Sequence, residues 1–471
     1  MKTPGINRQI LRIAIPSILA NITVPIVGMV DIAVAGHLEG LSGAAAFIGG
    51  VSIGSMLFDL LYWNFYFLRA GTGGLTAQAF GRKDWKSCAS LLVRGVGIAL
   101  IVAAVLLCIQ RPFTKLGFLV VDSTPEVREL ALQYFFVRVW AAPATLSLMS
   151  LRGWFIGMQD SVSSMLTDLV VNCVNVGASI VLTLGVGDWQ GMGFTGIALG
   201  TVIAQYSGLL FAVLRVVCKY RHLFAGFGME GIREAFDWQR LRGFFSLNTD
   251  LFLRSLGLTA IYIGFTGISS GYGDLMLASG AIMMKLLMLF SFFTDGFAYA
   301  AEALCGKYIG AGDRDMTRMS VRYIFRWSMG IGVVFMFVYW LCGTPLLRMM
   351  SSDAAVIDAC RQFLPWLLLM PPMGCAAFAW DGVYEGAVSS APMRNCMLAA
   401  MVLFFASWLL LDSLFVVPGA AFRAADPDAA AIHCLLCAYF VHLTVRTIWL
   451  TATYRRRILC KPFSGIRDND R

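Results

Sequence analysis

The chain has 471 residues, of which 58% are hydrophobic and 14% are charged, and its mean hydropathy is +0.72. Soluble domains carry about 25% charged residues, so this composition excludes a water-soluble globular protein and predicts a polytopic membrane protein. The net charge of +9 does not indicate a nucleic-acid partner, because the basic residues lie between apolar runs instead of on one face. We therefore expect the lipid bilayer, and no nucleic acid, around this chain.

The first apolar run, residues 10–35, is long enough to cross a bilayer and carries one carboxylate, Asp31. An Asp near the centre of a membrane helix costs about 2.5–3.5 kcal/mol, so such residues usually face a bundle interior or a watery cavity. Pro16 and Pro25 lie in the same run, where each removes a backbone donor and favours helix bending. We interpret Asp31 as a functional titratable group on a bendable helix; the alternative is a buried, hydrogen-bonded packing residue.

Twelve apolar runs have the length of a transmembrane helix. In chain order they cover about 10–35, 42–68, 88–110, 129–150, 161–185, 192–217, 244–270, 275–302, 320–342, 357–385, 391–417 and 428–453. The connections that follow even-numbered runs hold more Lys and Arg than those that follow odd-numbered runs. The positive-inside rule therefore places both termini in the cytoplasm. We predict a multi-pass protein of the cell (inner) membrane.

The one long cytoplasmic connection lies at the midpoint, where residues 229–244 mix apolar and basic side chains as in a short helix of the membrane interface. A shift of 229 residues places RGWFIG at 152–157 on DGVYEG at 381–386, with both glycines in register. Because one and the same offset aligns residues in separate loops and helices, the sequence indicates two parallel repeats. We predict an N-terminal six-helix lobe, a cytoplasmic inter-lobe linker, a C-terminal six-helix lobe and a cytoplasmic tail, at 1–217, 218–243, 244–455 and 456–471.

Several motifs resemble one transporter family. They are VDIAVAGHL at the end of the first span, GxxTAQAFGRKD after the second, NTDLFLRS at 248–255, DGFAYAAEALCGKYIGAGD at 295–313, and WDGVYEGA at 380–387 followed by MRN. Together they resemble the multidrug and toxic compound extrusion (MATE) family, in its DinF-like branch, from residue 8 to about 455. The resemblance implies an all-α polytopic membrane protein with twelve transmembrane helices in two pseudo-symmetric six-helix lobes around a central cavity. It also implies a monomeric antiporter, not an enzyme, that exports small organic and often cationic compounds in exchange for H+ or Na+ by alternating access.

In the N-terminal lobe, the ion-coupling positions that the resemblance implies are Asp31, Asn175, Ser179 and Thr201. Asn172 shares a face of the fifth span with Asn175 and Ser179, so it joins this set. Ser179 stands where the family has a second carboxylate, which leaves Asp31 as the lone charge of the site. A Na+ site loses more from a missing anionic ligand than a protonation site does, so the sequence favours H+ over Na+ and no other cofactor. The alternative for the two asparagines is hydrogen bonding between helices.

The C-terminal lobe carries more intramembrane charge. The charged residues considered there are Asp250, Arg254, Lys285, Asp295, Glu302, Asp381 and Glu385. Asp250 and Arg254 are four residues apart and are predicted to pair. Asp295 and Glu302 share a face of the eighth span, with Lys285 a few turns earlier as a candidate counter-ion. Asp381 and Glu385 share a face of the tenth span. These charges form a second proton route, a cation-binding wall or a salt-bridge network.

Two other classes of function compete with the antiporter. A lipid-linked precursor flippase of related architecture would show a strongly cationic cavity for pyrophosphate, whereas the membrane charges here are predominantly acidic. A membrane-embedded enzyme is suggested only by GYGD at 271–274, which resembles the GxGD motif of intramembrane aspartyl proteases but has no accompanying Tyr-Asp or HExxH motif. Cys434 and Cys437, beside His433, are interpreted as packing residues, because a zinc site needs two further ligands. We expect no metal.

Overall fold

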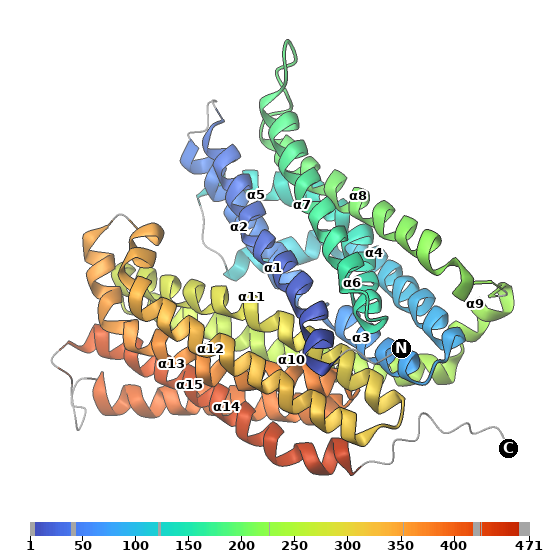
Figure 1. The fold of residues 1–471 in the computed structure, drawn as a ribbon. Helices are drawn as coiled ribbons and strands as arrows, with labels where there is room; N and C mark the ends of the chain where they lie inside the picture. Colours follow the sequence, from blue (N-terminus) through green and yellow to red (C-terminus); the bar gives the residue numbers. More distant parts are fainter. Residues whose placement is uncertain are drawn as a thin grey trace. The chain divides into compact units, whose positions relative to one another are not determined.

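The computed structural model describes residues 5–38, 44–120, 124–225, 227–351, 353–417, 424 and 426–460. Within this part of the chain, twelve helical stretches are long and apolar enough to cross a membrane, and each overlaps one of the twelve predicted runs (Figure 1). The predicted all-α membrane architecture is therefore confirmed. Packing divides the chain into two compact units. We call Ile15–Ser246 the N-terminal unit, and Met1–Ala14 together with Leu247–Arg471 the C-terminal unit.

The N-terminal unit contains most of the first helix and the helices that follow it. Its elements are α1 (Ile6–Gly36), α2 (Ala44–Trp63), α3 (Phe67–Gly81), α4 (Trp85–Val120), α5 (Pro125–Arg138), the 3-10 turn η1 (Val139–Ala141), α6 (Ala142–Gly157), α7 (Ser161–Leu184), α8 (Phe194–Tyr220), the 3-10 turn η2 (Arg221–Leu223) and α9 (Met229–Ala235). Pro16 and Pro25 both lie inside α1, which runs as one helix of 31 residues. The bending role of these prolines stays a prediction.

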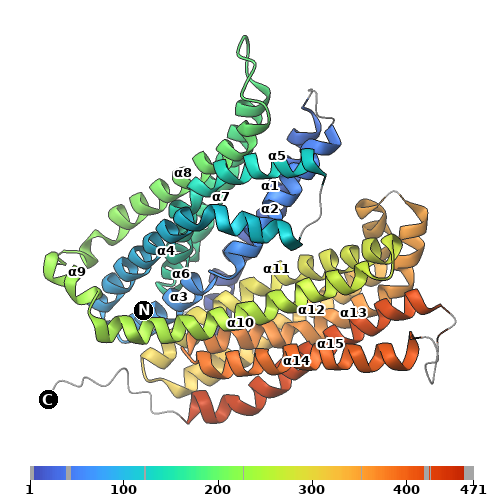
Figure 2. The ribbon, with the colours of Figure 1, turned by 180° about the vertical axis from the view of Figure 1, so that it is seen from behind.

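The C-terminal unit contains the remaining long helices, which the views from both sides show running along one another (Figure 2). Its elements are α10 (Trp238–Ser270), α11 (Asp274–Gly310), α12 (Arg314–Met350), α13 (Ala354–Gly386), α14 (Ser390–Phe415), α15 (Pro427–Tyr454) and the π turn η3 (Arg455–Leu459). The start of α1 packs in this unit: Tyr308 donates to Gln9 Oε1 at 2.8 Å, and Trp327 Nε1 donates to Asn7 Oδ1 at 3.1 Å. The predicted lobe boundaries stay a prediction.

Aspartates begin several of these helices. An Asp at a helix start accepts a hydrogen bond from a backbone N–H that has no partner within the helix. Asp160 accepts from Ser163 N at 3.3 Å at the start of α7, and Asp313 accepts from Met316 N at 2.9 Å at the start of α12. Asp353 and Asp426 begin α13 and α15 in the same way. These caps explain why the long helices restart directly after short connections.

The predicted repeat recurs in the packing inside each unit. A Cβ on Gly153 of α6 would lie 2.1 Å from the Arg69 carbonyl oxygen of α3, and a Cβ on Gly382 of α13 would lie 2.0 Å from the Ala298 carbonyl oxygen of α11. The shift of 229 residues relates both members of these pairs, since 382 − 153 and 298 − 69 are equal. At these matching positions, each unit therefore has a pair of helices in backbone contact through a glycine.

The same shift relates two pairs of residues with left-handed backbone. Lys83 has φ of 62° and Gly312 has φ of 75°, and Gln159 has φ of 63° where Val388 has φ of 50°. Side chains rarely adopt this region, and β-branched ones least of all. Its recurrence at matched positions shows that the turn geometry of the repeat overrides local residue preference.

The connection after α8 forms the short helix α9, which packs on α4. Arg94 Nε on α4 donates to the Ala235 carbonyl oxygen at 2.7 Å, and Phe236 occupies the space beside Gly97, where a Cβ would lie 2.3 Å from its ring. Trp238 follows with 72% of its surface exposed. The predicted short helix is therefore present, and its position at the membrane interface stays a prediction.

Candidate functional site

Asp31 lies near the end of α1 with only 6% of its surface exposed. Ser179 Oγ, on α7, donates a hydrogen bond to Asp31 Oδ1 at 3.2 Å. In the part of the chain that the structure describes, Asp31 forms no ion pair. A buried carboxylate normally has a cation or several donors as partners, because burial without them is costly. Asp31 is therefore a buried acid with a single neutral hydrogen-bond partner.

The other predicted coupling residues link α7 to its two neighbours. Asn175 Nδ2 donates to Thr201 Oγ1 of α8 at 3.0 Å, and Asn172 Nδ2 donates to Thr23 Oγ1 of α1. Asn175 is 3% exposed, and its Oδ1 atom has no hydrogen-bond partner among the described residues. Both asparagines thus make the interhelical hydrogen bonds that the sequence left open as an alternative. Only Asn175 keeps a free buried acceptor next to the turn that carries Ser179.

Gly200 allows α8 to approach this part of α7. A Cβ at Gly200 would lie 2.7 Å from Ser179 N and 2.8 Å from Ser179 Oγ, so no side chain fits there. Glycine permits this close approach because it has no Cβ. The contact places Thr201, the next residue, beside Asn175. The structure therefore brings the predicted polar positions of α7 and α8 into one cluster with Asp31.

Several charged groups in membrane helices of the N-terminal unit were not singled out from the sequence. Asp168 of α7 pairs with Arg152 of α6 at 2.6 Å. Arg138 ends α5, and Asp59 lies exposed on α2. These charges lie outside the predicted set of Asp31, Asn175, Ser179 and Thr201, so Asp31 is the lone charge of that set but not the lone carboxylate of the N-terminal lobe. Asp59, Arg138 and Asp168 lie within predicted apolar runs, and that position was the available signal.

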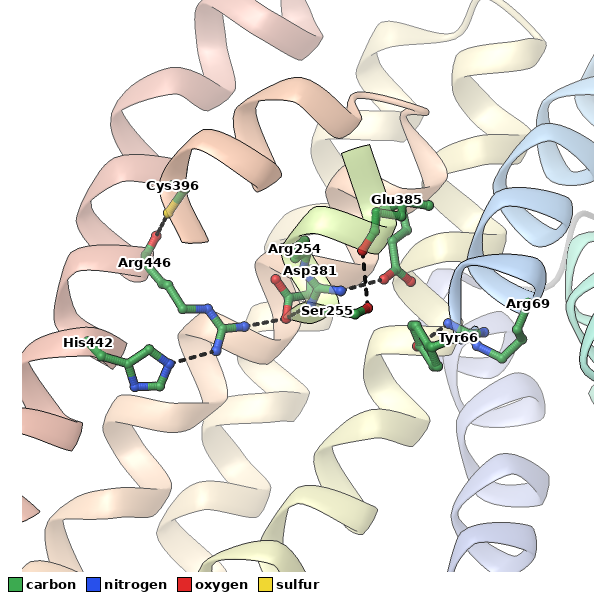
Figure 3. Close-up of polar contacts among 10 residues, drawn as sticks. Tyr66, Arg69, Arg254, Ser255, Asp381, Glu385, Cys396, His442 and Arg446 are labelled. Atoms are coloured by element: carbon green, nitrogen blue, oxygen red, sulfur yellow. Dashed lines mark hydrogen bonds and ion pairs between the residues drawn. The ribbon is translucent and has the colours of Figure 1, made fainter. Parts of the chain in front are cut away.

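In the C-terminal unit, Asp381 of α13 binds two arginines from neighbouring helices. Its Oδ2 atom accepts from Arg254 Nη2 of α10 at 2.6 Å and from Arg446 Nη2 of α15 (Figure 3). Glu385, one turn later, lies 3.5 Å from Arg254 Nη1. His442 Nε2 lies 3.4 Å from Arg446 Nη1. The two carboxylates and two guanidinium groups form a buried, charge-balanced network, which favours the salt-bridge interpretation.

Asp250 has different partners from the one predicted. Ser390 Oγ donates to its carboxylate at 2.7 Å, and Arg394 of α14 forms an ion pair with it. The predicted pairing of Asp250 with Arg254 is therefore wrong. A spacing of four places two side chains on one helix face, but in a bundle that face meets other helices, whose charged groups compete as partners.

The predicted counter-ion role of Lys285 is also wrong. Lys285 is exposed on α11 and forms no ion pair within the described ranges. Asp295 lies ten residues farther along the same helix, which corresponds to about 15 Å of axial distance. That distance exceeds the reach of an ion pair. Asp295 is half-buried, and Glu302 is fully buried.

No group of three His, Cys, Asp or Glu side chains is placed to hold a metal ion among the described residues. His433, beside Cys434 and Cys437, accepts a hydrogen bond from Trp366 Nε1 at 2.8 Å. The GYGD segment forms the turn from α10 to α11, and Asp274 is exposed in the first turn of α11. The residues that suggested an enzyme thus lie in an exposed turn.

The twelve spans and the buried charges of the bundle interiors define a polytopic α-helical membrane protein. The MatE family model matches residues 16–181 and 251–409. The chain is 31% identical over 453 residues to the DNA damage-inducible protein F of Escherichia coli (strain K12), covering 96% of this chain and 92% of that protein. The chain belongs to the MatE family, and it is a transporter, not an enzyme.

Two further comparisons agree with this family. The chain is 19% identical over 413 residues to the multidrug resistance protein MdtK of Edwardsiella ictaluri (strain 93-146), covering 86% of this chain and 85% of that protein. A crystal structure of MATE in the bent conformation superposes with a TM-score of 0.80 at 14% identity, over 96% of this chain and 97% of that one. The fold is therefore that of MATE transporters. Nothing in these comparisons favours the flippase.

Proposed function

We propose that this chain is a secondary active antiporter that exports small organic compounds in exchange for H+, with Asp31 as the coupling residue. The observation that carries this proposal is the buried Asp31 carboxylate, whose hydrogen-bond partner is the neutral Ser179. The multidrug name of the Edwardsiella relative supports multidrug-type, often cationic, substrates. We further propose a monomer in the inner membrane, with both termini in the cytoplasm and no nucleic-acid partner.

The choice of H+ over Na+ follows from the ligands around Asp31. Na+ requires several oxygen ligands to replace its hydration shell, whereas a proton requires one base. Ser179 Oγ already donates to Asp31, and the free buried oxygens on the same face of α7 among the described residues are Asn175 Oδ1 and Thr183 Oγ1, both neutral. This set offers one negative charge and few free oxygens. It supports proton binding better than Na+ binding.

Antiport follows from competition for one carboxylate. The ionised form of Asp31 attracts an organic cation, and protonation removes that attraction, so loading of a proton from outside releases the exported compound. The membrane potential contributes about 2.3 kcal/mol per charge for each 100 mV, which favours inward movement of the proton. Asp31 is carried by α1, and Asn172 ties the same helix to α7 through Thr23. Protonation of Asp31 therefore changes the contacts between α1 and α7.

The test uses purified protein in proteoliposomes and a fluorescent lipophilic cation as substrate. We expect an imposed proton gradient to drive efflux, and Asp31→Asn to reduce that efflux to the level of empty liposomes while the protein stays monodisperse in detergent. Ser179→Ala is the matched control: it removes the hydrogen bond but keeps the carboxylate, so proton-driven efflux should persist. Efflux by Asp31→Asn at the wild-type rate contradicts the coupling role. Efflux driven by a Na+ gradient alone, at equal pH and zero potential, contradicts the choice of ion.

A further inference from the structure

Arg138 is a cation in the fourth membrane span that neutral groups hold in place. Its Nη1 atom donates to Ser55 Oγ of α2 at 3.1 Å and to Tyr134 OH at 2.9 Å. Its guanidinium carbon lies 4.8 Å from the centre of the Phe58 ring. In the described ranges, Arg138 forms no ion pair with a carboxylate. Hydroxyl groups and a ring face thus fix the position of a full positive charge without neutralising it.

This fixed charge lies in the same part of the unit as Asp31. Phe58 and Tyr134 belong to one buried cluster that also contains Val34, which is three residues after Asp31 on α1. No hydrogen bond joins Arg138 to Asp31 among the described residues, so the one charge acts on the other only through space.

The other titratable groups around this charge are Asp59 and Tyr62 of α2 and Tyr134 of α5. Asp59 is exposed, and its negative charge partly offsets the positive charge of Arg138. Tyr62 and Tyr134 carry neutral hydroxyl groups. From α7, the group that contacts Asp31 is the neutral Ser179. Arg138 is therefore the one positive charge among the groups named around Asp31.

We propose that Arg138 is a positioning residue for coupling: its charge sets the pH at which Asp31 takes up its proton and weakens the attraction of the site for organic cations. This inference rests on the proposed function. A positive charge favours the ionised form of a nearby carboxylate, and in a site shielded from water the effect persists over distances longer than a hydrogen bond. Because Arg138 is held by Ser55 and Tyr134, its charge remains in place in both protonation states of Asp31.

The test compares Arg138→Gln, which removes the charge, with Arg138→Lys, which keeps it. In proteoliposomes with the lipophilic cation, we expect Arg138→Gln to move the pH of half-maximal proton-driven efflux upward by about one unit. The Lys variant should keep the wild-type profile. Arg128→Gln is the matched control, because Arg128 lies on the same helix, exposed, with its guanidinium 5.0 Å from the Phe118 ring centre. We expect no shift for the control, since its charge is not among those that act on Asp31.

A second readout is independent of transport. Binding of the lipophilic cation to the purified protein, measured at alkaline pH where Asp31 is ionised in both proteins, should be about tenfold tighter in Arg138→Gln than in wild type. An unchanged pH profile together with an unchanged affinity overturns the inference. If the Gln variant does not fold, Asp59→Asn replaces it: loss of this carboxylate should move the half-maximal pH downward, and the absence of a shift overturns the inference. If efflux by the wild-type protein does not depend on the proton gradient, the proposed function is contradicted. The binding measurement then still tests the role of Arg138.

Discussion

Asp31 and Asp381 are both buried carboxylates on membrane helices, but their surroundings differ. Asp31 accepts one hydrogen bond, from Ser179, whereas Asp381 accepts bonds from two arginines. A carboxylate that binds two guanidinium groups has its charge balanced by permanent cations, which is the arrangement of a structural ion-pair network. At the residue scale, this difference supports the proposed exchangeable charge on Asp31 and a structural role for Asp381.

A charge-balanced double variant tests the structural role of Asp381. We expect Asp381→Asn alone to lower the free energy of unfolding by about 3–5 kcal/mol, because it leaves a buried guanidinium without its partner. Adding Arg446→Gln should recover part of this loss and restore proton-driven efflux. Thermal unfolding in detergent and proteoliposome efflux are the two measurements. Asp358→Asn, at an exposed ion pair with Arg361, is the control and should change stability little. Loss of efflux in a double variant of wild-type stability would instead indicate a proton route through Asp381.

At the element scale, the two units share helix pairs that meet at glycines. Gly153 brings α6 onto the backbone of α3, and Gly382 brings α13 onto the backbone of α11. Small residues at such positions are typical of membrane helix packing, since there is no hydrophobic force between helices in lipid and close contact supplies the stabilisation. These contacts also place Arg152 and Asp381, each one residue before its glycine, in the bundle interior.

Alanine substitutions separate this packing role from helix propensity. Gly153→Ala should strongly destabilise the protein, by about 3 kcal/mol or more, because its Cβ meets a carbonyl oxygen that cannot move away. Gly177→Ala, on α7, is the matched control: nothing lies within 4 Å of its Cβ position, so it should gain up to about 1 kcal/mol from helix propensity. Thermal unfolding monitored by tryptophan fluorescence measures both. Equal effects of the two substitutions would contradict the packing argument.

At the scale of the whole molecule, the basic residues between spans predict orientation. The even-numbered connections and the tail hold the clusters Arg82, Lys83 and Lys86; Lys219, Arg221, Arg233, Arg240 and Arg242; Arg314 and Arg318; and Arg455, Arg456 and Arg457. An excess of Lys and Arg marks the cytoplasmic side. A fluorescent-protein fusion at the C-terminus should therefore fluoresce in bacterial cells, and a fusion truncated after Ser351, in an odd-numbered connection, should stay dark. Alkaline phosphatase fusions at the same sites should give the opposite pattern. Fluorescence from the Ser351 fusion would contradict the orientation.

The sequence by itself determined the features that depend on local composition. Twelve apolar runs are sufficient to predict twelve spans, because crossing a bilayer requires a continuous stretch of apolar residues. The 229-residue repeat predicted matching elements, and the matched glycines 153 and 382 confirm it in three dimensions. Asp31 and Ser179 could be brought together only because the resemblance to a family supplied positions on separate helices. Composition and spacing alone would have left them unconnected.

Only the tertiary structure decided which charges meet. Arg254 was assigned to Asp250 from their spacing, but it binds Asp381, 127 residues away. Lys285 was assigned to Asp295 but lies exposed, and Arg138 was not singled out at all. The physical reason is that a membrane helix presents its polar groups to neighbouring helices, so partners depend on which helices pack together and in what rotation. Hydropathy and spacing describe one helix at a time, whereas a buried charge selects its partner across the bundle.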